Sequence, residues 1–212
     1  MRIAPEQVLV EGPVGPIDVI VEAPATPRGI ALVGHPHPVF GGTNTNKVAQ
    51  TLAKTMTQLD YVALRPAFRG TGRTAGAHDE GRGETDDQLA VLAWARQRFG
   101  ADLPLVLTGF SFGAFVSANV ATRLAAAGTP ALRMVLVGTA AGHVEGARKY
   151  DTAAVAADTI VIHGAADETV PLYNVLQWAE PMDLPVVVVP GADHFFHRRL
   201  HVIRDIVVRA WK

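Results

Sequence analysis

The chain alternates between short apolar runs and longer stretches in which apolar residues recur every three or four positions. Short apolar runs bounded by Gly, Pro or polar residues are typical of buried strands, and the longer spacing is typical of amphipathic helices. The pattern predicts strands at Val8–Val10, Ile17–Val21, Ile30–Gly34, Tyr61–Leu64, Leu105–Thr108, Leu132–Val137, Thr159–His163 and Val186–Val189. It predicts helices at Lys47–Leu59, Glu84–Phe99, Phe112–Ala127, Pro171–Ala179 and Arg198–Arg209.

The order of these elements predicts the fold class. The first two strands form a hairpin around the turn at Gly12–Pro16, and strands and helices mostly alternate after it. Such alternation favours βαβ units, which build a mostly parallel central sheet with helices on both faces. We see no repeat, linker or internal boundary, so we expect a single α/β domain over residues 1–212.

Composition narrows the functional classes. The chain has 19 Lys and Arg against 20 Asp and Glu, so no basic excess points to nucleic acid as a partner. Cysteine is absent, which excludes disulfides and a thiolate nucleophile. No apolar run approaches the ~20 residues that span a bilayer, and the first residues lack the apolar core of a signal peptide. We therefore expect a cytoplasmic protein that does not bind membranes.

The strongest chemical signal is the segment 109–113, Gly-Phe-Ser-Phe-Gly, which matches G-x-S-x-G. It lies between a predicted strand and a predicted helix, the setting that a nucleophile elbow requires. The glycines let the chain turn sharply, and the helix N-terminus offers N–H groups to an oxyanion. We predict that Ser111 is the nucleophile and that the Phe112 N–H is an oxyanion donor. The alternative is that Ser111 only caps the helix.

A serine nucleophile needs a general base, and in folds with a nucleophile elbow the order along the chain is serine, acid, histidine. Asp167 follows the strand that ends at His163, and His194 follows the strand Val186–Val189. Because the carboxyl ends of parallel strands meet at one edge of the sheet, we predict that Asp167 and His194 lie beside Ser111.

Other residues compete for these two roles. Glu168 and Asp193 are neighbouring carboxylates, and His197 and His201 are alternative bases. We expect these four to be surface or packing residues. His163, at the end of a strand, is expected to have a structural, hydrogen-bonded role.

The loop at residues 35–42, His-Pro-His-Pro-Val-Phe-Gly-Gly, follows the predicted strand Ile30–Gly34. Folds with a nucleophile elbow take their second oxyanion donor from a loop at this place. Proline has no N–H, which leaves His37 or Val39, and we favour His37. The alternative is a rigid proline turn without a catalytic part. His35 and His37 could also ligate a metal, but no further ligand follows at a suitable spacing, so we expect neither a metal nor another cofactor.

Two further segments and a set of phenylalanines bear on the site. Residues 65–76 are glycine-rich but lack nucleotide-binding spacing, so we expect a loop at the rim of the site. The segment Thr139–Asp158 is too short for a cap domain, which predicts a loop or one short helix over a shallow, open site. The phenylalanines expected either to wall the pocket or to fill the core are Phe40, Phe110, Phe112, Phe195 and Phe196.

Together these segments resemble the α/β-hydrolase superfamily, from Val33 to His197. The motifs that carry the resemblance are HPHPVFGGT, AFRGTGRTAG, GFSFGA, HGAADETVP and GADHFF. They look most like a branch of small serine hydrolases with an H-P-H-P-x-x-G-G loop. The resemblance implies Ser111 as nucleophile, Asp167 as acid, His194 as base, and oxyanion donors on the backbone of Phe112 and of the His37 region. One departure is Thr74, where many members carry Ser; the hydroxyl is kept.

The predicted function is hydrolysis of carboxylic esters or thioesters of small molecules through an acyl-enzyme on Ser111. The expected partner is thus a small-molecule ester, and no oligomeric state is predicted. Acyl transfer and peptide-bond cleavage would use the same residues. A non-catalytic scaffold would be expected to have lost one of them, and none is missing here.

Overall fold

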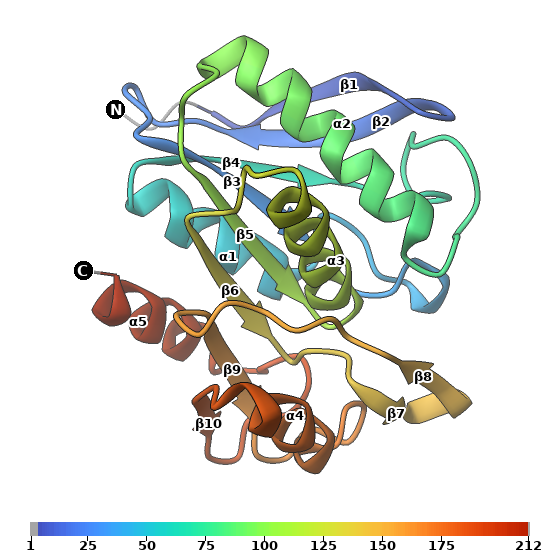
Figure 1. Cartoon of the computed structure of the whole chain (residues 1–212), viewed down its shortest axis with the longest axis vertical. Helices are drawn as coiled ribbons and strands as arrows, with labels where there is room; N and C mark the ends of the chain where they lie inside the picture. The colour runs from blue at the N-terminus through green and yellow to red at the C-terminus, as the bar shows by residue number, and fades with distance from the viewer. Residues whose placement is uncertain (1–3, 212) are drawn as a thin grey trace.

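Eight strands form one central sheet in the computed structural model, which describes residues 4–211 (Figure 1). The strands are β1 (Glu6–Gly12), β2 (Gly15–Glu22), β3 (Gly29–Gly34), β4 (Tyr61–Pro66), β5 (Leu105–Phe110), β6 (Arg133–Val137), β9 (Ile160–Gly164) and β10 (Val186–Val189). Their order in the sheet is β1-β2-β4-β3-β5-β6-β9-β10. Strand β2 runs antiparallel to β1 and β4, and the remaining pairs are parallel.

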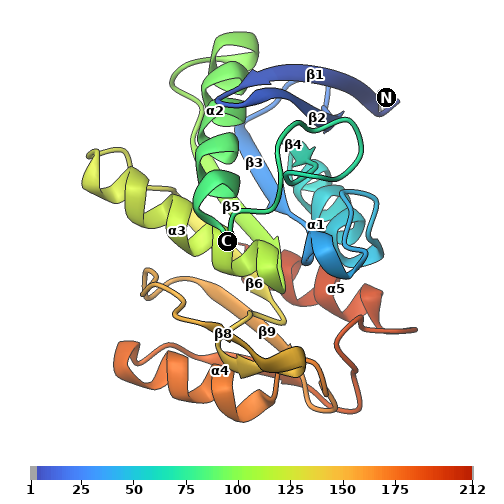
Figure 2. The same cartoon turned by 90° about the vertical axis from the view of Figure 1, so that its right-hand side faces the viewer.

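Helices cover both faces of the sheet, which confirms the predicted α/β class (Figure 2). Helices α1 (Lys47–Gln58) and α5 (Leu200–Ala210) lie on one face, and α2 (Arg82–Phe99), α3 (Phe112–Ala126) and α4 (Leu172–Ala179) lie on the other. Alternate residues of a strand serve the two layers. In β3, Leu32 packs into the cluster formed with α2, α3 and α4, whereas Ala31 and Val33 pack with α1 and α5.

The predicted strands and helices are all present, with shifted ends. Helix α2 begins two residues early, at Arg82, because the Glu84 carboxylate accepts the Gly81 N–H at 2.8 Å and so caps the first turn. The last helix begins late, at Leu200, because Phe196 and Arg198 have φ values of 52° and 61°, which no right-handed helix accepts. Residues 1–3, within the stretch predicted not to be a signal peptide, lie outside the described residues.

The segment Thr139–Asp158 differs from its prediction as a loop or short helix. It holds β7 (Gly142–Val144) and β8 (Arg148–Tyr150), which pair antiparallel, with the short 3-10 helix η2 (Glu145–Ala147) between them. Gly146 makes the turn with a φ of 78°. The Glu145 N–H donates to the Thr169 carbonyl at 3.0 Å, which ties this hairpin to the loop after β9.

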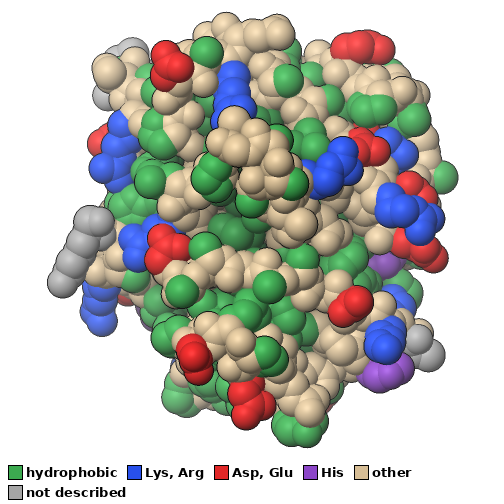
Figure 3. Space-filling view, viewed as in Figure 1, with side chains coloured by type: hydrophobic (Ala, Val, Ile, Leu, Met, Phe, Trp, Pro, Cys, Tyr) green, Lys and Arg blue, Asp and Glu red, His purple; other side chains and the backbone are tan. Residues whose placement is uncertain are grey.

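Charge is spread over the outer surface without a single-sign patch on the face seen in Figure 3, where basic and acidic side chains are interspersed. None of the helices formed by residues 4–211 combines the length and the hydropathy that a bilayer-spanning segment needs.

Two glycines let helix α3 rest directly on strand β3. A Cβ on Gly34 would lie 2.7 Å from the Gly113 carbonyl oxygen and 2.8 Å from the Gly113 Cα. A Cβ on Gly113 would clash in turn with the backbone of Gly34 and His35. Because these neighbours are backbone atoms, no side chain can move aside. The contact therefore holds the start of α3, and Ser111 before it, against the carboxyl end of β3.

Gly113→Ala is expected to lower the free energy of unfolding by about 1–3 kcal/mol through overpacking. Urea unfolding followed by circular dichroism measures the loss. Gly128→Ala is the control, because nothing lies within 4 Å of its added methyl and its φ of +73° reports backbone strain alone. If Gly113→Ala unfolds at the same urea concentration as the wild type, the close contact does not constrain the fold.

Candidate active site

Ser111 occupies a strained turn between β5 and α3. Its φ of 56° and ψ of −119° are unusual for a residue with a side chain and cost about 1–3 kcal/mol. The Ser111 side chain makes no capping hydrogen bond to α3, so the capping alternative does not describe it. Its Oγ instead lies 3.0 Å from Nε2 of His194. The turn thus presents the hydroxyl to the histidine rather than to the helix.

His194 links Ser111 to Asp167. The Nδ1 atom of His194 lies 2.7 Å from Oδ2 of Asp167, while Nε2 faces the serine hydroxyl. Asp167 comes from the loop after β9 and His194 from the loop after β10, at the carboxyl ends of the strands. All three side chains are buried. The structure therefore brings together the three residues predicted from the sequence.

Backbone groups hold the Asp167 carboxylate in place. Its Oδ1 accepts the N–H groups of Thr169 at 3.0 Å and Val170 at 2.8 Å, which leaves Oδ2 for His194. A carboxylate only accepts hydrogen bonds, so Nδ1 of His194 carries the proton. The lone pair on Nε2 consequently faces the Ser111 hydroxyl, the orientation that a general base needs.

The competing histidines and carboxylates lie elsewhere. His197 is exposed and pairs with Asp193 at 2.6 Å. His201 is on α5 beside a separate surface pocket, and Glu168 is exposed. His163 is fully buried, and its Nε2 lies 2.9 Å from the Val170 carbonyl and 3.4 Å from Oδ2 of Asp167. Burial lowers the pKa of His163, so a neutral ring supports the Asp167 loop.

The structure of the loop after β3 distinguishes between its two candidate oxyanion donors, the N–H groups of His37 and Val39. The Val39 N–H donates to Nδ1 of His37 at 3.3 Å and is therefore engaged. His37 and Ser111 line the same cavity. Burial, followed by the proximity of His78 and Arg148, lowers the pKa of His37 to about 4, so the ring is neutral near pH 7 and can accept. Phe112 is the first residue of α3, directly after Ser111.

His35 orients this loop. Its Nδ1 lies 2.7 Å from the Pro36 carbonyl and its Nε2 accepts the Phe68 N–H at 2.8 Å. Burial lowers the pKa of His35 to about 3, so the ring stays neutral. Because a trans peptide places C=O and N–H on opposite sides, fixing the Pro36 carbonyl also fixes the direction of the His37 N–H. With both ring nitrogens engaged, His35 is not free to bind a metal, and no metal-ligating cluster occurs within residues 4–211.

The glycine-rich loop at residues 65–76 was expected at the rim of the site, but its residues do not line the cavity beside Ser111. It is instead anchored to strand β2 and helix α2. Arg69 forms a buried ion pair with Asp87 at 2.9 Å, and the Thr74 hydroxyl bonds the Ala67 carbonyl and the Asp18 N–H. Through the Phe68 N–H the loop supports His35, so its contribution to the site is indirect.

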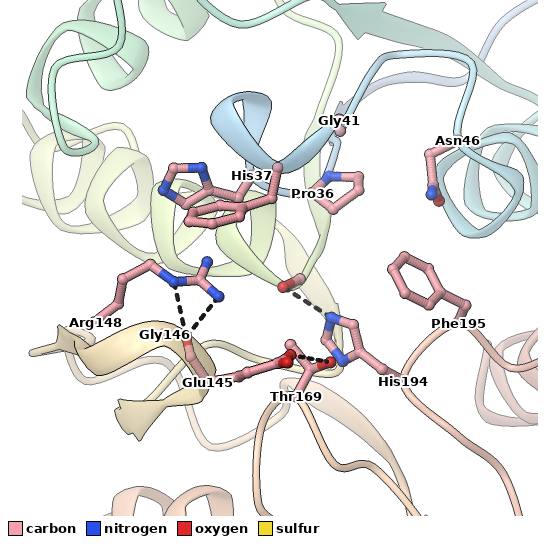
Figure 4. Close-up of a pocket in the computed structure, with 13 residues that line it drawn as sticks. Pro36, His37, Gly41, Asn46, Glu145, Gly146, Arg148, Thr169, His194 and Phe195 are labelled. Carbon is pink, nitrogen blue, oxygen red and sulfur yellow. Dashed lines mark hydrogen bonds between the residues drawn. The ribbon is translucent and has the colours of Figure 1, made fainter.

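A cavity of about 380 Å³ opens beside Ser111 (Figure 4). Phe40 and Phe195 line it, whereas Phe110, Phe112 and Phe196 are fully buried core residues. Sequence reasoning missed five of the lining residues, namely Asn46, Glu145, Gly146, Arg148 and Thr169. In the sequence, Asn46 has only the signal of a helix cap, and in the structure it does cap α1. The residues of the β7–β8 hairpin give no signal, because strands of three residues are too short to show a periodicity.

Comparisons with known proteins identify the family of the chain. The model of the thioesterase domain family matches residues 56–182. An uncharacterized protein of Rickettsia prowazekii is 31% identical over 201 residues, which is 90% of this chain and 82% of that protein.

Two solved structures are similar over almost their whole length. An α/β serine hydrolase without a lid from Xanthomonas campestris is 33% identical, with a TM-score of 0.85 over 97% of this chain and 93% of that one. An α/β serine hydrolase homologue from Coxiella burnetii is 35% identical, with a TM-score of 0.86 over 98% and 97%. The chain therefore belongs to the thioesterase domain family, within the α/β-hydrolase superfamily, and its fold lacks a lid.

Proposed function

We propose that the protein hydrolyses carboxylic esters or thioesters of small molecules through an acyl-enzyme on Ser111. The observation that carries the proposal is the hydrogen-bonded series of Ser111, His194 and Asp167, with the serine hydroxyl at a cavity. The match to the thioesterase domain family supports the inclusion of thioesters. We also assign the chain to a branch with an H-P-H-P-x-x-G-G loop.

The geometry supports one reaction sequence. Oγ of Ser111 attacks the substrate carbonyl carbon while Nε2 of His194 takes the hydroxyl proton, and Asp167 stabilises the resulting imidazolium. The backbone N–H groups of His37 and Phe112 bind the oxyanion. Collapse of the tetrahedral intermediate breaks the ester bond, and His194 returns the proton to the leaving group. Water, activated by His194, then hydrolyses the acyl-enzyme and releases the acid.

Ser111→Ala and His194→Ala are expected to lose esterase activity to a similar extent, because nucleophile and base act as a unit. Losses near ~10⁶ in kcat are typical for a triad. Hydrolysis of p-nitrophenyl acetate by the purified variants measures the effect.

His197→Ala is the matched control, because its ring is exposed and pairs with Asp193 instead of Ser111. It should retain most of the wild-type kcat. An active His194→Ala together with an inactive His197→Ala would assign the role of base to His197 instead of His194.

The enzyme is expected to prefer short acyl chains. A cavity of about 380 Å³ is near the small end of ligand pockets, and the hairpin β7–β8 gives it a wall but no cap. Each buried CH₂ contributes roughly 0.8 kcal/mol, so kcat/KM should rise only until the cavity is filled and then level off.

The p-nitrophenyl esters of acetate, butyrate, octanoate and palmitate test this expectation. A maximum at palmitate, or a rate that jumps once the substrate forms micelles, would require an acyl tunnel or an interfacial mechanism that this cavity does not provide.

A further inference from the structure

The hairpin β7–β8 places one cationic side chain in the wall of the cavity. We propose that Arg148 binds an anionic group, a carboxylate or a phosphate, on the substrate whose ester bond is cleaved at Ser111. This inference rests on the proposed function, because it names the class of substrate that the same cavity accepts.

Contacts on two sides hold the Arg148 guanidinium in position. Nε and Nη2 donate to the Glu145 carbonyl at 3.0 and 2.8 Å, and Cζ lies 4.0 Å from the centre of the Phe40 ring. Figure 4 shows the guanidinium between the hairpin and the His37 loop. Such a preorganised group loses little conformational freedom when it binds a ligand.

No carboxylate neutralises this charge. In the part of the chain that the structure describes, Arg148 forms no ion pair, whereas Arg65, Arg69 and Arg73 each pair with an acidic residue. Glu145 offers Arg148 only its backbone carbonyl, since its carboxylate is turned toward the Thr169 hydroxyl at 3.4 Å (Figure 4).

Two titratable groups near Arg148, Tyr150 and His37, are neutral near pH 7. Burial raises the pKa of Tyr150, which follows on the same strand, and the phenol stays protonated. His37 lines the cavity as a neutral ring because burial, His78 and Arg148 all lower its pKa. The cavity lining contains one Arg or Lys side chain, Arg148, and one carboxylate, Glu145, which faces Thr169 and forms no ion pair with Arg148.

A guanidinium of this kind is suited to oxyanions. Its planar donors match carboxylate and phosphate oxygens, and a charge-assisted hydrogen bond is about twice as strong as a neutral one. The competing interpretation is structural, with Arg148 only fastening the turn of the hairpin. The two interpretations differ in whether its loss affects charged and neutral substrates unequally.

Two sets of matched esters provide the test. The leaving-group set is 4-acetoxybenzoate, 4-acetoxyphenyl phosphate and the neutral methyl 4-acetoxybenzoate. The acyl set is the mono-4-nitrophenyl ester of adipic acid and its neutral methyl ester. We expect wild-type kcat/KM to be roughly tenfold higher for the anionic members of at least one set, as a single charged hydrogen bond gives. The preference should weaken with added salt.

Arg148→Gln is expected to abolish this preference, because kcat/KM should fall much further for the anionic esters than for the neutral ones. Lys149→Gln is the matched control, because the next residue of β8 is exposed and points to the opposite face. It should keep the preference. A preference in one set identifies the side of the ester that Arg148 contacts, and comparison of carboxylate with phosphate identifies the anion.

Equal kcat/KM for charged and neutral esters in both sets would overturn the inference. So would a preference that survives Arg148→Gln, or an equal loss on charged and neutral esters in that variant. The proposed function fails differently, because then neither neutral nor charged esters would be hydrolysed by the wild type.

Discussion

The backbone contact between Gly34 and Gly113 is the constraint on which the site depends. Without side chains at these two positions, α3 lies against the end of β3, directly after the turn at Ser111 with its positive φ of 56°. The same contact brings the loop after β3 next to the N-terminus of α3. This steric condition thus brings Ser111 close to the two candidate oxyanion donors, the backbone N–H groups of His37 and Phe112.

Buried neutral histidines then organise the loops around that turn. His35 fixes the peptide before His37, and His163 supports the loop of Asp167. Because burial holds the pKa of each ring below its usual value, these two rings act as fixed hydrogen-bonding groups and not as charges. His194 differs from them in facing a carboxylate on one side and a serine hydroxyl on the other.

The sequence was sufficient for the parts of the site that follow from strand order. Ser111, Asp167 and His194 each follow a strand with a clear apolar pattern, and parallel strands bring their carboxyl ends together regardless of detail. The pattern was insufficient where tertiary contacts decide. The hairpin of β7 and β8 has three-residue strands held by a bond from Glu145 to Thr169, and no local periodicity predicts it. The sequence therefore offered no indication that Arg148 lines the cavity. The segment at residues 65–76 has the composition of a rim, but the buried ion pairs of Arg65 with Glu22 and of Arg69 with Asp87 hold it away from the cavity.

The central claim is that the hydroxyl of Ser111 is an activated nucleophile. Reaction of the folded protein with a fluorophosphonate, followed by peptide mass spectrometry, tests it most directly, because such reagents phosphonylate a base-activated serine far faster than an ordinary hydroxyl group. The chain has one other serine, Ser117, a buried residue on α3 whose hydroxyl donates to the Thr108 carbonyl at 3.1 Å, so it serves as an internal control. We expect one adduct per chain, on Ser111, that is absent from His194→Ala. A folded protein that stays unlabelled, or that labels as readily after loss of His194, would contradict it.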